Sequence, residues 1–500
     1  MFLTAVLIAA WCARAAAQEQ VDPLVLSPEQ AVTFALERSL VVKGARLDPQ
    51  IAALEVRAAD AAFSPHLSGQ AGIADTRTPP LTVLDPQSGL VTRQIASGAA
   101  IGQALPWGSS YSVEWDAARL TGNSPIVRFN PQLTTDATVT LTQHLLRGLT
   151  IDEARATRLI SRKGQIVSEA ELASTVAATT RAVLRAYWVW IYTREYLAVE
   201  QQSLALSQSL LRDDRERAAL GKIAAVDVVE AEAEVARRSD VILSATKDVA
   251  NAEDQLRFLI FAPHDPEQGR DLAPPSPLNE PAISANATPE MIPQALDSRQ
   301  DLRILRAYLD IDDVTVRRLR NDRLPDVSLT VSYTGEGAAG ITVPPAQGNR
   351  GPAAGPRDFS SALGDLVHGR YPGRSAGLSV SWPIRSQAAA EAAKASVKRQ
   401  QDETMLRNAE QEVVTEVKSV IRTTEANRQR LPLTENAVTL AQRRLDSEQR
   451  KFVVGLSTSF LVIQAQRDLT SGREGQVRSV LDYRLSLADL QAVQTISVPQ

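Results

Sequence analysis

Three carboxylates follow one another at helical spacing in the stretch GKIAAVDVVEAEAEV, residues 221–235. Asp227, Glu230 and Glu234 are three and four positions apart, so they fall on about the same face of a helix. Repeated around an axis, such carboxylates would favour cations and disfavour anions. An ordinary solvated helix face gives the same pattern, because exposed acidic residues are common on helices. The sequence leaves both interpretations open.

The other reactive side chains do not converge on a site. Asp213 and Asp214 are neighbours in a helical segment, as are Asp312 and Asp313, and adjacent helical side chains do not face one another. None of the histidines forms a metal-like pair or lies beside a nucleophile. These histidines are His66, His144, His264 and His368. The sequence therefore predicts no catalytic residues, no metal ligands and no cofactor.

The first residues have the pattern of an export signal. An apolar stretch followed by small residues in MFLTAVLIAAWCARAAAQEQ predicts a signal peptide over residues 1–17. The only cysteine, Cys12, lies in this segment, and Trp11 before it argues against lipidation. The mature chain would have no thiol, which excludes disulfides, cysteine-ligated zinc and thiol catalysis. A net charge of −4 with scattered basic residues offers no surface for nucleic acid.

Two long helical segments repeat one plan. Residues 152–261 contain no proline and have apolar residues at three and four spacings, which predicts a helical hairpin with its turn near Gly221. Residues 387–493 predict a second hairpin with its turn near Gly455. Aligned without gaps, GLSTSFLVIQAQRDL matches the stretch that begins at Gly221, and Glu230 meets Gln464.

A shorter block of helices and strands precedes each hairpin. The first repeat is predicted over residues 18–262, with a short helix, a second helix and strands over about 66–77 and 134–144. The second repeat is predicted over residues 288–500, with helices and strands over about 326–334 and 376–383. Residues 263–287 are rich in proline and predict a linker. The predicted fold class is thus an internally duplicated α+β chain with about four strands.

The clearest strands alternate apolar and hydroxyl side chains, with Ser328, Thr330 and Ser332 on the hydroxyl face. A β-sandwich gives similar alternation, but the aromatic ends favour a membrane barrel with the apolar face toward lipid. Four strands cannot close a barrel, and open edges in lipid would leave backbone groups unpaired. Three chains would supply about twelve strands around a water-filled lumen. The predicted lipid-facing residues are Val327, Leu329, Val331, Tyr333, Leu378, Val380 and Trp382.

The connections between the strands differ in the two repeats. The first contains SYSVEWD, with Tyr111, Val113 and Trp115 in alternation, and we interpret it as an added hairpin arm at the rim. Whether residues 109–118 join the barrel is left open. The second connection, Gly335 to Gly373, is rich in glycine and proline and predicts an external loop.

These features resemble the TolC-type outer membrane efflux proteins over nearly the whole mature chain. The motifs are LTQHLLRG at residues 141–148, AYWVWIYTREYL at 186–197, and the DVVEAE turn at 221–232 with its copy at 455–466. The resemblance implies a homotrimer, with a β-barrel in the lipid of the outer membrane and an α-helical tunnel in the periplasm. It also implies docking on an inner-membrane pump through a periplasmic adaptor protein. The trimer would be a passive duct for efflux or type I secretion of small molecules or proteins.

The resemblance makes the two helical turns the periplasmic entrance. Well-known members carry acidic residues at the positions of Leu461 and Gln464 and an arginine at Ser457, so an acidic ring from the second turn is not expected. A common proline is replaced by His144. The candidate entrance residues are Gly221, Asp227, Glu230, Glu234, Gly455, Leu461 and Gln464. The competing interpretations are a periplasmic adaptor, which has one hairpin, and a structural coiled-coil protein of the envelope.

Overall fold

A computed structural model describes residues 23–81, 85–275, 290–343, 356–382 and 387–494. The predicted signal peptide, residues 1–17, lies outside the described residues, as do residues 276–287 of the predicted linker. The chain divides into two compact units. Unit 1 comprises Met1–Pro49, Ser168–Leu305 and Met405–Gln500, and unit 2 comprises Gln50–Val167 and Arg306–Thr404.

Helices make up most of the described chain. They are α2 (Pro28–Arg38), α3 (Leu40–Ala45), α4 (Asp48–Ala61), α5 (Glu153–Ala219), α6 (Ala225–Ile260), α7 (Met291–Ser298), α8 (Gln300–Asn321), α9 (Phe359–Val367), α10 (Gln387–Val453) and α11 (Ser459–Gln494), with a 3₁₀ turn at Pro266–Gly269. Across the described ranges, no helix has an apolar stretch long enough to cross a bilayer.

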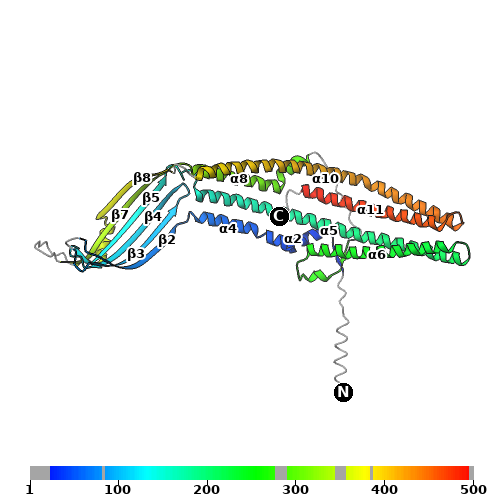
Figure 1. Cartoon of the computed structure of the whole chain (residues 1–500), viewed down its shortest axis with the longest axis horizontal. Coiled ribbons are helices and arrows are strands. Elements are labelled where there is room, and N and C mark those ends of the chain that lie inside the picture. The colour runs from blue at the N-terminus through cyan, green and yellow to red at the C-terminus, as the bar shows by residue number, and fades with distance from the viewer. Residues whose placement is uncertain (1–22, 82–84, 276–289, 344–355, 383–386, 495–500) are drawn as a thin grey trace, which may run out of the picture. The chain divides into compact units, whose positions relative to one another are not determined.

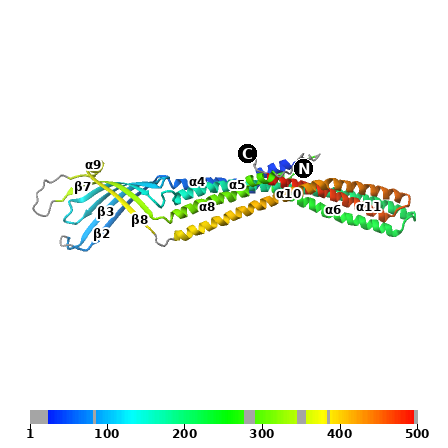
Figure 2. The ribbon, with the colours of Figure 1, turned by 90° about the horizontal axis from the view of Figure 1, so that it is seen from above.

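The two hairpins of unit 1, α5–α6 and α10–α11, lie side by side with their turns at the same end (Figures 1 and 2). Gly221 has a φ of +70° and Gly455 a φ of +77°, a left-handed conformation that glycine adopts without steric cost. Pro432 lies inside α10, which continues to Val453. Near the turns, all four helices contribute to one apolar core. This core contains Leu210, Leu211, Ala231, Leu445, Phe452, Val462, Ile463, Ala465 and Leu469.

A second core of unit 1 surrounds the aromatic stretch of α5. Tyr187 and Trp190 are fully buried, and the Tyr187 hydroxyl donates to the carbonyl of Leu26 at 3.0 Å. Burying each such ring stabilises the fold by about 1.5–3 kcal/mol. The short strands β1 (Leu24–Val25) and β6 (Leu272–Ala273) pair in parallel beside this core. These contacts attach the start of the first repeat and the segment that follows α6 to α5.

Unit 2 contains one antiparallel sheet whose strand order is β2-β3-β4-β5-β7-β8 (Figure 1). Its strands are β2 (His66–Thr78), β3 (Leu90–Ala104), β4 (Ser109–Gly122), β5 (Phe129–His144), β7 (Asp326–Thr342) and β8 (Tyr371–Ser381). The α+β fold class predicted from the sequence is therefore confirmed. The sheet has six strands where the sequence predicted about four.

The two additional strands, β3 and β4, lie between β2 and β5. Residues 109–118 therefore belong to the sheet, and the interpretation of SYSVEWD as an arm at the rim is wrong. Tyr111 and Val113 pair with Leu141 and Val139 on β5, which continues the apolar face across the sheet. The strand β3 escaped prediction because glycine and alanine interrupt its alternation.

The connection between β7 and β8 is also more ordered than a loop where it is described. The strand β7 continues to Thr342, and α9 lies against β5 and β7. A Cβ atom on Gly337 would lie 1.9 Å from the carbonyl oxygen of Ala362, so only glycine lets α9 approach this closely. Asp358 caps the helix by accepting a 3.1 Å hydrogen bond from the Ser361 amide.

Candidate functional site

The three carboxylates near the turn of the first hairpin differ in their exposure to solvent. Asp227 is half-buried and accepts a 3.3 Å hydrogen bond from the Ala224 amide, which caps α6. Glu230 is exposed. Glu234 is 2% exposed and lies inside the bundle. The three carboxylates therefore do not form one solvent-facing row, although they follow one another at helical spacing.

The turn of the second hairpin exposes apolar side chains. Val454 and Leu456 flank Gly455 and are 68% and 78% exposed. Leu461 is 40% exposed, and Gln464 donates a 3.1 Å hydrogen bond to Asp468 on its own helix. This turn therefore contributes apolar surface, and the first turn contributes carboxylates beside its own exposed Leu220, Val226 and Val229.

Close to the turns, the first hairpin is joined to the second by a buried acid and an arginine. The Ser459 hydroxyl donates to the Asp214 carboxylate at 2.5 Å, and Asp214 is fully buried. Burial raises the pKa of Asp214, and this hydrogen bond opposes the rise. Arg217 donates to the Phe452 carbonyl at 2.9 Å and lies 4.2 Å above the Phe452 ring. Removing the Ser459 hydroxyl would leave the buried Asp214 carboxylate without this hydrogen-bond donor.

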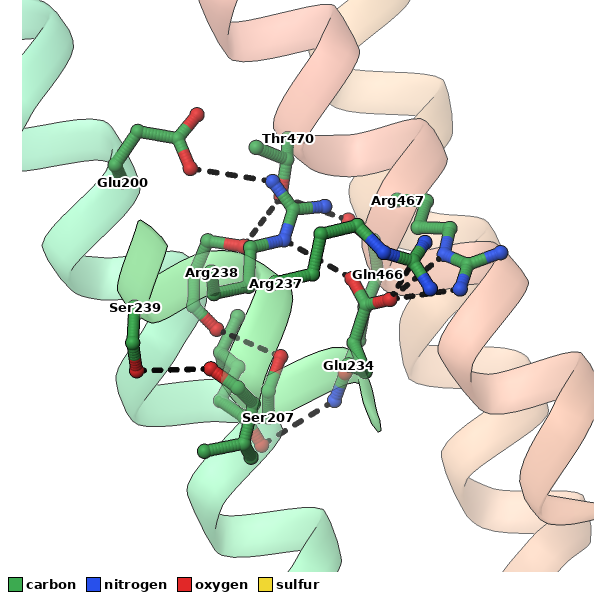
Figure 3. A network of polar contacts seen from close by, with 12 residues as sticks. Glu200, Ser207, Glu234, Arg237, Arg238, Ser239, Gln466, Arg467 and Thr470 are labelled. Atoms are coloured by element: carbon green, nitrogen blue, oxygen red, sulfur yellow. Dashed lines mark hydrogen bonds and ion pairs between the residues drawn. The ribbon is translucent and has the colours of Figure 1, made fainter. Parts of the chain in front are cut away.

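About four turns farther from the hairpin turn along α5, a chain of ion pairs connects three helices (Figure 3). Arg238 on α6 donates to Glu234 at 3.0 Å and to Glu200 on α5 at 3.2 Å. Arg467 approaches from α11 and donates to Glu234 at 3.0 and 2.7 Å. Arg237 pairs with Glu234 from the exposed side at 3.2 Å. One carboxylate thus holds α11 against α6.

The surroundings of Glu234 stabilise its charged form. Burial raises the pKa of Glu234, but the hydrogen bonds and positive charges of Arg467 and Arg238 outweigh burial and lower that pKa below its usual range. A glutamate buried without cationic partners would instead take up a proton. Glu234 therefore has the environment of a structural contact between hairpins.

The faces of the sheet in unit 2 are chemically distinct. Val327 pairs with Val380 and Leu329 with Leu378, on one face. On the opposite face the Ser328 and Ser379 hydroxyls are 2.7 Å apart. Ser332 and Ser375 make a 2.6 Å contact, and Thr138 and Thr334 a 3.0 Å contact, on this same face. In the isolated chain, Leu329, Val331, Tyr333, Leu378, Val380 and Trp382 are all exposed on the apolar side.

The hydroxyl face also carries a row of carboxylates that sequence reasoning missed. Asp116 on β4 pairs with Asp136 on β5, which pairs with Glu336 on β7. Glu114 lies two residues before Asp116 on the same face. Glu114 and Asp116 are close in the sequence, but only the strand register places Asp136 and Glu336 beside them. Within the described ranges, no His, Cys, Asp and Glu side chains are grouped to hold a metal ion.

The contacts between the hairpins were likewise not identified from the sequence. Glu234 and Arg238 are four positions apart, which signals a helical ion pair. Nothing in the sequence connects either residue with Glu200 or Arg467, because these lie far away in the chain. The register between two packed helices decides these pairings.

Comparison with known proteins identifies relatives for part of the sequence and for the whole fold. Residues 291–493 match the family model described as "Outer membrane efflux protein". No curated protein matches the chain. The resemblance predicted from the sequence is confirmed by this family match.

Several solved structures share the fold at low sequence identity. A membrane protein from Pseudomonas aeruginosa is 16% identical with a TM-score of 0.69, covering 93% of both chains. The CmeC outer membrane channel of Campylobacter jejuni is 13% identical with a TM-score of 0.66, covering 93% of this chain and 85% of CmeC. The outer membrane protein VceC of Vibrio cholerae is 15% identical with a TM-score of 0.64, covering 93% of this chain and 96% of VceC.

Proposed function

We propose, because residues 291–493 match the outer membrane efflux protein family model, that copies of this chain assemble into a passive duct through the outer membrane. The helical hairpins would extend the duct into the periplasm. Its cargo would be small molecules or proteins that leave the cell through a tripartite efflux pump or a type I secretion system. Energy for transport would come from the partner proteins.

The observation that carries this proposal is the division of the sheet into two faces. Carboxylates in a membrane-spanning segment are costly unless they face water. Asp116, Asp136 and Glu336 share the hydroxyl face, whereas Leu329 and Leu378 are on the other. Water on the first face and lipid on the second satisfy both sets. We therefore assign the seven predicted apolar strand residues, from Val327 to Trp382, to the lipid side.

The two edges of the sheet support assembly from several copies. The terminal strands β2 and β8 pair on one side only, and all their residues are exposed. Unpaired backbone groups in lipid cost several kcal/mol each, so β8 of one copy would pair with β2 of the next. Three copies with six strands each would give about eighteen strands, and so a wider lumen than the twelve expected from the sequence.

The turns of the hairpins are the proposed periplasmic entrance and the end that meets an adaptor protein. Val454 and Leu456 expose apolar surface at one turn, and Leu220 is 68% exposed at the other. Exposed apolar groups at one end of a helical bundle are typical of a protein contact. Asp227 and Glu230 would then lie at the mouth, whereas the buried Glu234 would not contact the cargo.

Cysteine cross-linking tests the proposed assembly. The chain's only natural cysteine is Cys12. An A71C substitution on β2 would be combined with single cysteines at successive positions 374–378 of β8. Disulfide-linked dimers and trimers in isolated outer membranes are the expected result, with the strongest product at one register.

A matched control uses two strands of the same chain. The pair S332C and S375C replaces hydroxyls that are 2.6 Å apart and should close within one chain without increasing the molecular mass. A soluble periplasmic monomer, in which the β2–β8 pairs never link chains while the control pair closes, would refute the duct.

A further inference from the structure

The helices α5 and α11 are joined by polar contacts at successive levels. Asp214 meets Ser459, and farther from the turns Ser203 meets Thr470, with the two hydroxyls 2.9 Å apart. Residue numbers fall along α5 as they rise along α11, so the helices are antiparallel. Gln202 accepts a 3.0 Å hydrogen bond from Arg473 at the next level. The register between the two hairpins is therefore fixed over several turns.

Two glutamates meet one turn beyond the Ser203–Thr470 contact. Glu200 precedes Ser203 by three residues and Glu474 follows Thr470 by four, so antiparallel packing brings the two side chains to the same level. The Ser203–Thr470 contact and the helical register therefore place the Glu474 carboxyl group next to that of Glu200. A hydrogen bond between carboxyl groups requires that one of them carries a proton.

One oxygen of the buried Glu200 carboxylate has no hydrogen-bond donor among the residues that the structure describes, so a proton between the two carboxyl groups would supply one. Glu200 is fully buried, and its Oε2 atom accepts from Arg238 at 3.2 Å. In the described part of the chain, no side-chain or backbone donor reaches its Oε1 atom. A buried carboxylate oxygen without a donor is costly, and the hydroxyl of a protonated Glu474 is the donor at hand.

We propose that Glu200 and Glu474 share one proton and form a pH-sensitive clasp between the two hairpins. The proton joins α5 to α11 at acidic pH. Its loss at higher pH places two like charges side by side at this contact and loosens it. The proposal concerns the packing of unit 1 and holds whatever the chain transports.

The charged groups around the clasp support a single shared proton. With Glu474 neutral, the negative charges of Glu200 and Glu234 balance the positive charges of Arg238 and Arg467. Loss of the proton adds one negative charge, and among the described residues no further buried cation balances it. The charged and titratable groups around the clasp are Tyr196 on α5, Glu234 and Arg238 on α6, and Arg467 and Arg473 on α11.

The pH range follows from the environment of Glu474. Burial raises the pKa of Glu474 from 4.5 to about 7; the neighbouring Glu200 carboxyl adds to the rise, and Arg238 opposes it. A carboxyl whose pKa is raised by folding weakens the folded contact as pH rises from its ordinary pKa to the raised one. The clasp should therefore be strongest below about pH 4.5 and should have lost this stabilisation above about pH 7.

Hydrogen exchange of the purified full-length protein tests the clasp. Exchange of peptides from residues 196–207 and 466–478 would be followed from about pH 6 to about pH 8 and corrected for intrinsic exchange rates. In the wild type, the corrected rate should rise with a midpoint near 7. The E474Q variant keeps a donor and cannot titrate, so its corrected rate should be independent of pH.

Two further variants separate the clasp from other causes. E200Q removes the neighbouring charge, so the midpoint should move down by about one pH unit or more. E195Q removes an exposed charge from the same helix and should behave as the wild type. An unchanged midpoint in E474Q or E200Q, or a pH-independent wild type, would overturn the proposal. Since exchange is measured without transport, the test stands even if the chain forms no duct.

Discussion

Replacing Glu234 by glutamine should loosen the contact between α6 and α11. The wild-type carboxylate is 2% exposed and accepts hydrogen bonds from Arg238 and from both Nε and Nη2 of Arg467. Glutamine has nearly the same size, so packing is preserved. It offers one acceptor oxygen and no charge, which leaves two arginines paired with a neutral group.

The expected cost follows from the exposure of the two partners. Breaking a buried ion pair by removing one partner costs about 3–5 kcal/mol. The Arg238 side chain is 12% exposed but that of Arg467 is 36% exposed, so water screens part of the loss. We therefore expect about 3 kcal/mol, which corresponds to a roughly 100-fold increase in local opening.

Hydrogen exchange of α6 and α11 peptides at neutral pH measures this opening. The matched control is E230Q, which removes an exposed carboxylate one helical turn away and should change exchange by less than about 0.5 kcal/mol. The loss in free energy of local opening for the double variant E234Q/R467Q should be smaller than the sum of the losses for the two single variants, because the double variant no longer contains an Arg467 without its charged partner. Equal effects of E234Q and E230Q, or strict additivity, would refute the reasoning.

Three further outcomes are expected. Burial and the neighbouring Asp402 raise the pKa of Asp312 from 3.8 to about 6, so the α8–α10 contact should weaken as pH rises between these values; in hydrogen exchange D402N should reduce this dependence and D312N should abolish it. G221A should lower the thermal unfolding temperature through about 1 kcal/mol of backbone strain, since the φ of Gly221 is +70° and no atom lies within 4 Å of the added methyl group. Combined D227A and E230A substitutions should reduce the cation preference of single channels in planar bilayers, and an unchanged preference would exclude these residues from the entrance.

Much of the architecture could be predicted because it depends on periodic patterns. Long proline-free segments with apolar residues at three and four spacings indicate helices, and glycine marks their turns. Strict alternation indicated β7 and β8 in the same way. The strand β3 could not be recognised, because Gly98 and Gly102 and several alanines leave little alternation to detect. A strand of this kind is specified mainly by its neighbours in the sheet.

The contacts of the candidate site depend on register between elements, which local patterns do not contain. Helical spacing places Asp227, Glu230 and Glu234 on about one face, yet it does not say that another helix covers only Glu234. The same limit applies to Glu200 and Glu474, which are far apart in the chain and meet only through antiparallel packing. Such contacts follow from the tertiary arrangement of helices whose existence is predictable.

The two hairpins descend from one plan, but their packing has made them chemically different. In the ungapped alignment Val229 corresponds to Ile463. The Val229 side chain is 61% exposed, whereas that of Ile463 is 3% exposed. In the same alignment Glu234 corresponds to Asp468, and Asp468 pairs with Arg444 on the surface of its own hairpin.

The helix α11 is thus covered by the first hairpin, while α6 keeps apolar side chains exposed at Val226, Val229, Leu243 and Phe258. A single chain leaves this apolar face of α6 in water, and a neighbouring copy would cover it. The same incompleteness appears at the free edges β2 and β8 in the other unit. Both units of the chain therefore favour assembly for independent reasons: the sheet needs backbone partners and the helices need apolar contacts.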